Sequence, residues 1–211
     1  MPPSILTGLA PDPRRPGYHL VDIDRGRFAS LPGAALVGLG LTVGREIGPR
    51  VLARLHELAD LEGAYRAALR ALGRRAHARY DLRRRLLQKQ HPPQAVEGAL
   101  DRLAAHDLLD DTRFAREYAA TKAGRGRGPA RLVKDLLAQG VDRRVADEAV
   151  RTALADEGVD PVRAVRAVAE KRARQLANLP VAVRRRRIVA YLARRGFQGP
   201  EVREVVDRIC S

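Results

Sequence analysis

The sequence predicts a mainly α-helical protein: three tandem three-helix repeats in an elongated array, preceded by a small β-hairpin and a helix. Three observations support this fold class. Residues that begin helices recur through the second two thirds of the chain, and a run of strand-forming residues is confined to the N-terminal quarter. An apolar i,i+4 pair also recurs three times, at spacings of 50 and 56 residues.

The N-terminal part divides into a tail and a hairpin. Residues 1–16 are rich in proline, and we expect a disordered tail there. Tyr18–Asp24 (YHLVDID) is rich in strand formers, Arg25-Gly26 can form a tight turn, and Arg27–Leu31 can return as a second strand. Helical periodicity begins after Gly48-Pro49, so we assign residues 17–62 to a hairpin and a helix.

The rest of the chain reads as short helices separated by turns. Asp81, Asp111, Asp142 and Asp160 can each accept a hydrogen bond from a free amide in a first helical turn. Prolines fall in first turns, where their missing N–H costs nothing. The expected helices are 63–78, 81–90, 93–106, 111–123, 128–139, 142–157, 160–177, 180–195 and 199–210.

These helices fall into three repeats, over residues 63–109, 110–158 and 159–211. The second helix of each repeat carries one apolar pair: Leu82 with Leu86, Leu132 with Leu136, and Ile188 with Leu192. Four residues after each pair comes a turn, at Gln90, Gly140 and Gly196. Because one unit is too small to bury its faces alone, the units are expected to stack.

The charge of the chain is unevenly distributed. The 211 residues include 40 basic and 25 acidic ones, a net charge of +15. Residues 1–63 hold seven Arg and seven acids, so the whole excess lies in residues 64–211. Charge confined in this way is typical of a surface that contacts a polyanion or an acidic protein. A solvated compositional excess of arginine is the alternative.

Cellular location and assembly follow from what the sequence lacks. The single Cys210 cannot form an intramolecular disulfide. The longest apolar stretch, Leu31–Val43, is interrupted by glycines and is too short to span a bilayer. We therefore expect a cytoplasmic protein that does not contact a membrane. We also expect a monomer that needs no cofactor.

The sequence does not indicate a catalytic or metal site. His106 with Asp110 and Asp111 could be drawn as a metal corner, but a helix end followed by a helix start explains these residues better. The glycine-rich segment 124–128 (GRGRG) resembles a phosphate loop, yet no strand precedes it and no GK[ST] follows. Cys210 has no neighbouring base. We expect neither an enzyme nor a bound metal.

The basic residues of the second helices are the positive signal. Arg127, Arg131 and Lys134 lie at i, i+4 and i+7, opposite the apolar pair of the same helix. Such residues can bind DNA phosphates or the carboxylates of an acidic protein groove, and the residues alone leave both partners open. Helix-turn-helix recognition of DNA also stays open. The candidate binding residues are Arg83, Arg84, Arg85, Arg125, Arg127, Arg131, Lys134, Arg184, Arg185, Arg186, Arg187, Arg194 and Arg195.

Several segments resemble one known family. LLDDTRFA at Leu108–Ala115 and GPARLVKDLLAQG at Gly128–Gly140 are similar to motifs of the RecX family, and the resemblance covers about residues 62–211. YDLRRRLLQKQ at Tyr80–Gln90 agrees with the first repeat, and YLARRGFQ at Tyr191–Gln198 resembles the family's closing RRGF. The sequence departs from the family pattern at Gln90-His91, where a glycine turn is usual.

The resemblance implies a function. RecX-like proteins are negative regulators of the RecA recombinase, built from three-helix repeats without catalytic residues. They bind the RecA–DNA filament and suppress its ATPase, strand-exchange and coprotease activities, in DNA repair and the SOS response. The resemblance therefore implies the RecA filament as partner, with weak, non-specific contact to single- or double-stranded DNA. A direct DNA-binding protein of helix-turn-helix type is the alternative.

Overall fold

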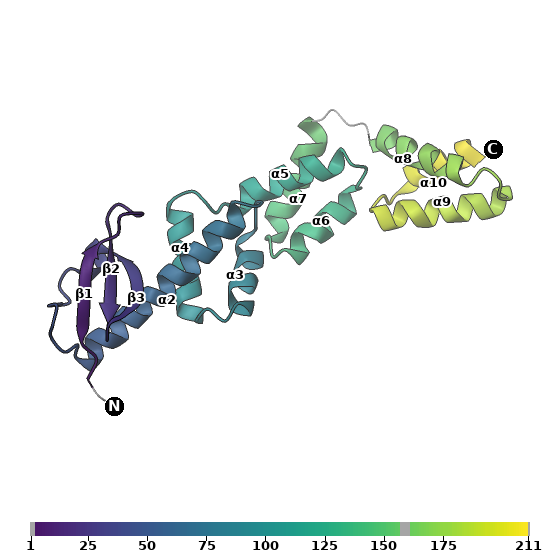
Figure 1. Cartoon of the computed structure of the whole chain (residues 1–211). Helices are drawn as coiled ribbons and strands as arrows, with labels where there is room; N and C mark the ends of the chain where they lie inside the picture. Colours follow the sequence, from purple (N-terminus) through teal and green to yellow (C-terminus); the bar gives the residue numbers. More distant parts are fainter. Residues whose placement is uncertain (1–2, 157–160, 211) are drawn as a thin grey trace. The chain divides into compact units, whose positions relative to one another are not determined.

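The protein is mainly helical, as predicted. A computed structural model describes residues 3–156 and 161–210, and within these ranges it holds one three-stranded antiparallel sheet and ten helices (Figure 1). The described chain forms two compact units. The first comprises residues 3–75 with Leu82–Leu108, and the second comprises Ala76–Asp81 with residues 109–210. Among these residues, no helix is both long and apolar enough to cross a membrane.

The sheet contains the predicted hairpin with a shifted turn. Strands β2 (Tyr18–Ile23) and β3 (Gly26–Pro32) pair antiparallel, and Ile23 faces Gly26 in the register. The two turn residues are therefore Asp24 and Arg25, not the predicted Arg25-Gly26, and both have a positive φ (50° and 64°). This is the backbone twist that a two-residue hairpin turn needs, and Asp tolerates it better than most residues.

The predicted disordered tail, residues 1–16, is wrong over most of its length. Strand β1 (Leu6–Pro11) pairs antiparallel with β2 and completes the sheet in the order β1-β2-β3. Leu6 is fully buried in the apolar cluster under the sheet. The prolines of this segment were the reason for predicting disorder. Pro11, however, is the last residue of an edge strand, where its missing N–H is tolerated.

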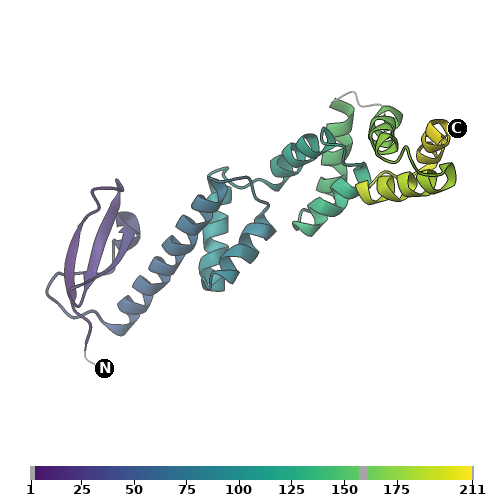
Figure 2. The same cartoon turned by 45° about the vertical axis from the view of Figure 1, so that its right-hand side comes forward.

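A single long helix crosses the predicted boundary between residues 62 and 63. After the short α1 (Gly33–Leu36), helix α2 runs without a break over Pro49–Leu72, so the helix predicted at 63–78 is wrong at both ends. Its first half packs Leu55 and Leu58 into the cluster beneath the sheet, and its second half lies along α4. Both views of the molecule show α2 leaving the sheet and continuing beside α4 (Figures 1 and 2).

The remaining helices follow the repeats. The first repeat contributes α3 (Arg79–Gln88) and α4 (Pro93–Ala105). The second comprises α5 (Asp111–Ala123), α6 (Pro129–Ala138) and α7 (Arg143–Asp156). The third comprises α8 (Pro161–Gln175), α9 (Val181–Arg195) and α10 (Pro200–Cys210). The predicted boundary at 158 and 159 and the predicted helix start at Asp160 lie outside the described residues.

The three apolar pairs are the centres of the repeats, as predicted. All six side chains, in α3, α6 and α9, are at most 2% exposed. Each second helix also ends in the same way: the residue at the predicted turn is left-handed, and the next N–H donates to the carbonyl of the second member of the pair. The three bonds run from His91 to Leu86, from Val141 to Leu136, and from Phe197 to Leu192.

Two of the predicted helix starts are displaced. Asp142 accepts hydrogen bonds from the amides of Arg144 and Val145, as expected of an N-cap. The cap of α5, however, is Asp110, because its carboxylate accepts from the amides of Thr112 and Arg113. Asp81 lies inside α3 and pairs with His77, 2.7 Å away.

The segment between α2 and α3 packs with the second repeat, although it was assigned to the first (63–109). Ala78 is fully buried in the apolar cluster of α5, α6 and α7. The amide of Arg79 donates to the carboxylate of Asp111 at 2.7 Å, and the Tyr80 side chain lies directly against Gly140. Residues 76–81 therefore complete the second core.

Candidate binding surface

The basic face of α6 is partly neutralised within the protein. Arg127 lies in the loop before the helix and forms an ion pair with Asp135, while Arg131 pairs with the other oxygen of the same carboxylate at 2.9 Å. Lys134 is exposed and forms no ion pair with any residue that the structure describes. The three cations that were predicted to be equivalent therefore differ. Arg127 and Arg131 share the carboxylate of Asp135, whereas Lys134 has no ion-pair partner among the described residues.

The hydroxyl of Tyr118 joins this cluster from α5. It accepts a hydrogen bond from Arg127 at 2.9 Å, and burial together with the nearby Asp135 raises the pKa of the phenol. A neutral phenol is therefore maintained beside the acid over the physiological pH range. Asp135 was not singled out in the sequence, although an i,i+4 spacing from Arg131 on one helix was a usable signal.

The basic ends of α6 and α9 meet at a contact between two glycines. The N–H of Gly128 donates to the carbonyl of Arg195 at 2.7 Å, and the N–H of Ala130 donates to the carbonyl of Gly196 at 3.3 Å. A Cβ on Gly128 would lie 2.5 Å from the Gly196 carbonyl carbon, so a side chain there would prevent the approach. Gly196 has φ 89° and lies against the backbone of Arg131, which makes a side chain unfavourable for two reasons.

This contact places two sequence motifs side by side. The GRGRGPAR segment of the second repeat and the ARRG segment of the third, 60 to 70 residues apart in the chain, meet there. We call these hydrogen-bonded backbones the glycine joint. Five of the predicted binding residues lie within three residues of Gly128 or Gly196 in the sequence: Arg125, Arg127, Arg131, Arg194 and Arg195.

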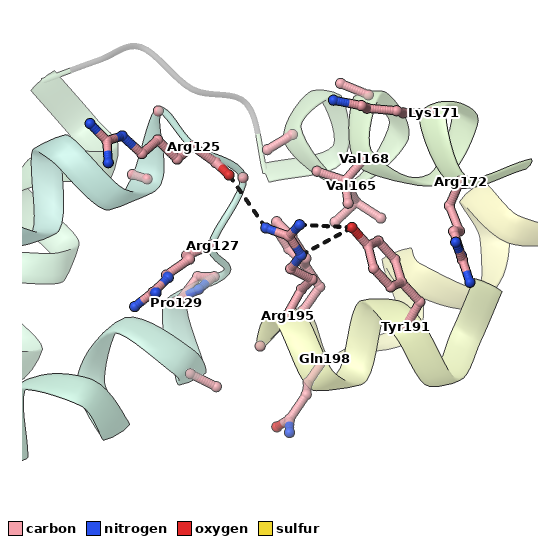
Figure 3. A pocket seen from close by; sticks show the side chains of 18 of the residues that line it. Arg125, Arg127, Pro129, Val165, Val168, Lys171, Arg172, Tyr191, Arg195 and Gln198 are labelled. Carbon is pink, nitrogen blue, oxygen red and sulfur yellow. Dashed lines mark hydrogen bonds between the residues drawn. The ribbon is translucent and has the colours of Figure 1, made fainter. Parts of the chain in front are cut away.

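A pocket of about 600 Å³ lies next to the glycine joint (Figure 3). Its walls come from the α5–α6 loop, from α8 and from the end of α9. Tyr191 stands in its wall between two guanidinium groups: Arg172 lies 5.1 Å and Arg195 5.2 Å from the ring centre. Arg195 also donates to the Tyr191 hydroxyl at 2.8 Å.

The glycine-rich loop is not available to hold an anion through its backbone. The amides of all five residues 124–128 donate to backbone carbonyls, four within the loop and the end of α5, and that of Gly128 across the joint. An anion in the pocket would therefore have to be bound by side chains. The sequence-based rejection of a phosphate loop agrees with this hydrogen bonding.

The remaining predicted residues lie away from the joint. Arg185, at the first turns of α9, pairs with Asp207 at 2.6 Å, and Arg184 buries its Nε. Arg186 and Arg187 are exposed. In the first unit, Arg83 pairs with Glu97 at 2.5 Å, while Arg84 and Arg85 are exposed and engaged in interactions of their own. Arg184 and Arg195 are eleven residues apart on one helix, which is about 16 Å.

The acidic residues that could have suggested a metal have structural roles. Asp110 caps α5 and Asp111 binds the amide of Arg79, while His106 ends α4. Each carboxylate is thereby committed to backbone amides. Lys171 and Arg172 of α8 were not among the predicted binding residues. They line the pocket because residues of the α5–α6 loop, which is distant in sequence, form its other side.

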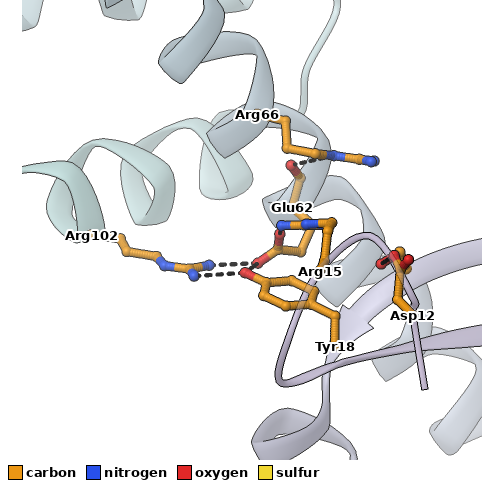
Figure 4. Close-up of polar contacts among 7 residues, drawn as sticks. Asp12, Arg15, Tyr18, Glu62, Arg66 and Arg102 are labelled. Atoms are coloured by element: carbon orange, nitrogen blue, oxygen red, sulfur yellow. Dashed lines mark hydrogen bonds and ion pairs between the residues drawn. The ribbon is translucent and has the colours of Figure 1, made fainter.

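The first unit has a polar centre of a different kind (Figure 4). Glu62, in the middle of α2, is only 1% exposed and binds Arg15 at 3.1 Å, Arg102 at 2.5 Å and the hydroxyl of Tyr18 at 3.3 Å. These partners come from the β1–β2 loop, from α4 and from β2. Burial opposes the charge of Arg102, but its bonds to Tyr18 and Glu62 outweigh burial and raise its pKa.

The fold and this surface define a tandem three-helix repeat protein with basic second helices. Family models described as the first, second and third three-helix domains of RecX match residues 64–103, 110–150 and 160–206. The chain belongs to the RecX family.

Individual relatives agree with this assignment. A "Regulatory protein RecX" of Halorhodospira halophila (strain DSM 244 / SL1) is 38% identical over 146 residues, which are 69% of this chain and 87% of the relative. One from Xanthomonas axonopodis pv. citri (strain 306) is 37% identical over 138 residues, 64% of this chain and 81% of the relative.

Solved structures show the same fold. A crystal structure of regulatory protein RecX covers 98% of this chain and of its own, at a TM-score of 0.72 and 20% identity. A crystal structure of RecX from Lactobacillus salivarius covers 71% of this chain and 96% of its own, at a TM-score of 0.59 and 20% identity.

Proposed function

We propose that this protein is a negative regulator of the RecA recombinase. It binds the RecA–DNA filament and suppresses the ATPase, strand-exchange and coprotease activities of RecA, in DNA repair and the SOS response. It acts in the cytoplasm, as a monomer and without catalytic residues. Membership in the RecX family supports the partner. The observation that carries the proposal is that the second helix of each repeat buries an apolar pair and bears arginine or lysine beside it.

The chemistry of these cations suits a filament of protein and DNA. Guanidinium groups bind carboxylates and phosphates through paired hydrogen bonds, so the same surface can contact RecA, its DNA, or both. Single exposed ion pairs contribute little, but three repeats that bind together raise the apparent affinity through effective concentration. Lys134 of α6 and Arg194 of α9, both exposed, are the residues we assign to this contact near the glycine joint.

A second function, direct DNA binding of the helix-turn-helix type, is favoured by one observation. Three-helix units with basic second helices are compatible with placing a helix in a DNA groove. This function predicts binding to short DNA without RecA, and affinity that falls steeply as salt increases.

The first test is the ATPase rate of preformed RecA filaments on single-stranded DNA while this protein is titrated in. A parallel series contains naked competitor DNA. We expect inhibition at less than one molecule per RecA, insensitive to modest amounts of competitor. Inhibition that requires saturation of the DNA and is relieved by competitor would instead assign the protein to direct DNA binding.

A pair of charge-reversal variants tests the assigned surface. Lys134→Glu with Arg194→Glu should raise the amount of protein needed for half inhibition roughly tenfold, because both reversed charges would repel carboxylates or phosphates. Arg163→Glu with Arg166→Glu, two exposed positions on α8 of the same unit, introduces the same charge change and should leave inhibition unchanged. Equal effects of the two pairs would mean that net charge alone, not this surface, drives binding.

A further inference from the structure

Two exposed apolar residues of the second unit lie next to one glycine at the C-terminal end of α6. Tyr80, in the first turn of α3, is 51% exposed, and Leu137, in the last turn of α6, is 37% exposed. The Tyr80 side chain packs directly on Gly140, since a Cβ on that glycine would lie 2.6 Å from the Cδ1 atom of the ring. The N–H of Gly140 donates to the carbonyl of Leu137 at 2.9 Å. We call Tyr80 and Leu137 the apolar patch.

Tyr80 differs from the other aromatic residues of the chain. Every other aromatic side chain is buried or half-buried, so Tyr80 is the one exposed ring in the described part of the protein. Its hydroxyl has no hydrogen-bond partner among the described residues. An aromatic ring removes a large apolar area from water when a partner covers it, and tyrosine is enriched among the residues that dominate binding at protein interfaces. The ring therefore has the character of an interface anchor.

The backbone fixes the position of this ring before any partner binds. Ala78 is fully buried in the second core, and the amide of Arg79 donates to the carboxylate of Asp111 at 2.7 Å. Gly140 has φ 79°, so a glycine there serves both the left-handed turn and the close approach of Tyr80. A side chain that is already held in place loses little conformational freedom on binding, which favours its use as an anchor.

The charges beside the apolar patch favour an acidic partner. Lys134 lies three residues before Leu137 on α6, is exposed, and forms no ion pair within the described chain. The acids nearest to it in sequence are already engaged, since Asp135 binds two arginines and Asp142 accepts from two amides of α7. A carboxylate of a partner would therefore meet a cation that the protein itself leaves unpaired.

DNA and a second copy of the chain both fit the apolar patch less well. A DNA backbone offers phosphates to Lys134 but no apolar surface to Leu137, and one ring does not form a track for successive bases of a strand. A second copy would present the same surface, whose nearest carboxylates are engaged, and the net charge of +15 opposes its approach. An acidic protein surface is the partner that these residues favour.

We propose that the apolar patch docks on a protein surface with an apolar centre and carboxylates at its edge. Tyr80 and Leu137 cover the apolar centre, and Lys134 pairs with one of the carboxylates. The inference rests on the proposed function, under which this surface belongs to RecA. It assigns the C-terminal end of α6 to the protein of the filament and not to its DNA.

The test compares variants of the full chain in the RecA ATPase assay. Tyr80→Ala with Leu137→Ala should raise the amount of protein needed for half inhibition about tenfold or more, because both anchors are removed. Val37→Ala with Val181→Ala, at two other exposed apolar positions, should leave it unchanged. Leu137→Glu alone leaves the packing of Tyr80 on Gly140 intact and should weaken inhibition as well. Urea midpoints close to that of the parent check that each variant folds.

Two further measurements identify the occupant of the apolar patch. Binding of a fluorescent single-stranded oligonucleotide without RecA should change by less than about twofold in Tyr80→Ala with Leu137→Ala. A loss of oligonucleotide binding that parallels the loss of inhibition would assign the patch to DNA and overturn the proposal. Sedimentation of the parent as a dimer and of this double variant as a monomer would assign the patch to a second copy, which would overturn it too.

The outcomes also separate this inference from the proposed function. A parent chain that does not inhibit RecA would refute the proposed function, and the docking on RecA with it. A parent that inhibits, together with a Tyr80→Ala, Leu137→Ala variant that inhibits equally well, would refute the role of the apolar patch alone. Salt gives a last check: the loss in this variant should persist at high salt, whereas the loss in Lys134→Gln should shrink as the charges are screened. A loss that disappears at high salt would contradict an apolar contact.

Discussion

The two units of the molecule are held together internally by opposite means. In the first unit, one buried carboxylate on the long helix α2, that of Glu62, binds side chains from the β1–β2 loop, from β2 and from α4. In the second unit, the second and third repeats have separate apolar cores and meet at the glycine joint, where side chains are absent and two backbone hydrogen bonds form. One connection needs a charged group, and the other needs the smallest residue at two positions.

This difference determines how each connection can fail. If the buried carboxylate or its partners are removed, the charges that remain are uncompensated in a region with little water, which is unfavourable. A backbone contact fails when any side chain keeps the two chains apart. The first connection is therefore sensitive to the loss of a charged side chain, and the second is sensitive to added side-chain volume.

The largest effect is expected at Glu62. Glu62→Ala should lower the free energy of unfolding by about 2–4 kcal/mol, somewhat less than for a fully buried ion pair because Arg15 and Arg102 are partly exposed. Urea denaturation measures this loss. Glu57→Ala, at an exposed position of the same helix, should cost about 0.5 kcal/mol or less. Similar losses in both variants would show that the network does not stabilise the first unit.

The glycine joint should respond to added volume. Gly196→Ala places a side chain at positive φ and against the backbone of Arg131, which should cost about 1–3 kcal/mol. Hydrogen exchange should show faster exchange at the amides of Gly128 and Ala130, because their acceptors move away. Gly124→Ala, at an exposed residue with a right-handed backbone, is the matched control. Unchanged exchange at both amides would contradict the role assigned to the joint.

Removing the acid of α6 should have a smaller effect on stability and a clear one on binding. Asp135→Asn releases Arg127 and Arg131 and should change stability by about 1 kcal/mol or less. Affinity for DNA should rise, and its dependence on salt should steepen by about one ion for each released cation that reaches a phosphate. Asp147→Asn removes the same charge from an exposed pair on α7 and should leave the slope nearly unchanged.

The smallest effect is a pH dependence of the first unit. Burial, followed by the charge of Lys89, lowers the pKa of His91 below its ordinary value of 6.5. The unfolded chain therefore takes up the proton first, so this contribution to stability is present above about pH 6.5 and is lost as the pH falls below it. Urea midpoints at about pH 8 and about pH 5.5 should differ less in His91→Gln than in the parent. An equal pH dependence in both proteins would exclude His91 as its origin.

The repeats could be read from the sequence because they rest on local rules. The pairs Leu132 with Leu136 and Ile188 with Leu192 follow helical periodicity, and Gly140 and Gly196 follow from the need for a left-handed residue after each helix. Gln90 adopts the same left-handed turn at φ 63°, so the departure from glycine noted in the sequence did not change the geometry. These features depend on neighbours within about five residues, and a single sequence contains that information.

Other features were decided by tertiary contacts. Strand β1 forms because it can pair with β2, and a proline-rich context concealed it. Helix α2 continues past residue 62 because its two halves pack on different partners, the sheet and α4. The side chains that bind the Glu62 carboxylate lie 40 to 47 residues away from it in sequence. No local pattern carries such pairings, since they depend on how elements pack.

The amino-acid sequence was enough to predict the helical repeats, the centres of their cores, the excess of basic residues and the resemblance to RecX. Packing in three dimensions was needed to show which basic residues are neutralised by Asp135, which glycines form the joint, and that Lys171, Arg172 and Arg125 line one pocket. The physical reason is the range of the interactions. Helix periodicity and capping act within a few residues, whereas ion pairing and close backbone approach depend on distances in space that folding alone establishes.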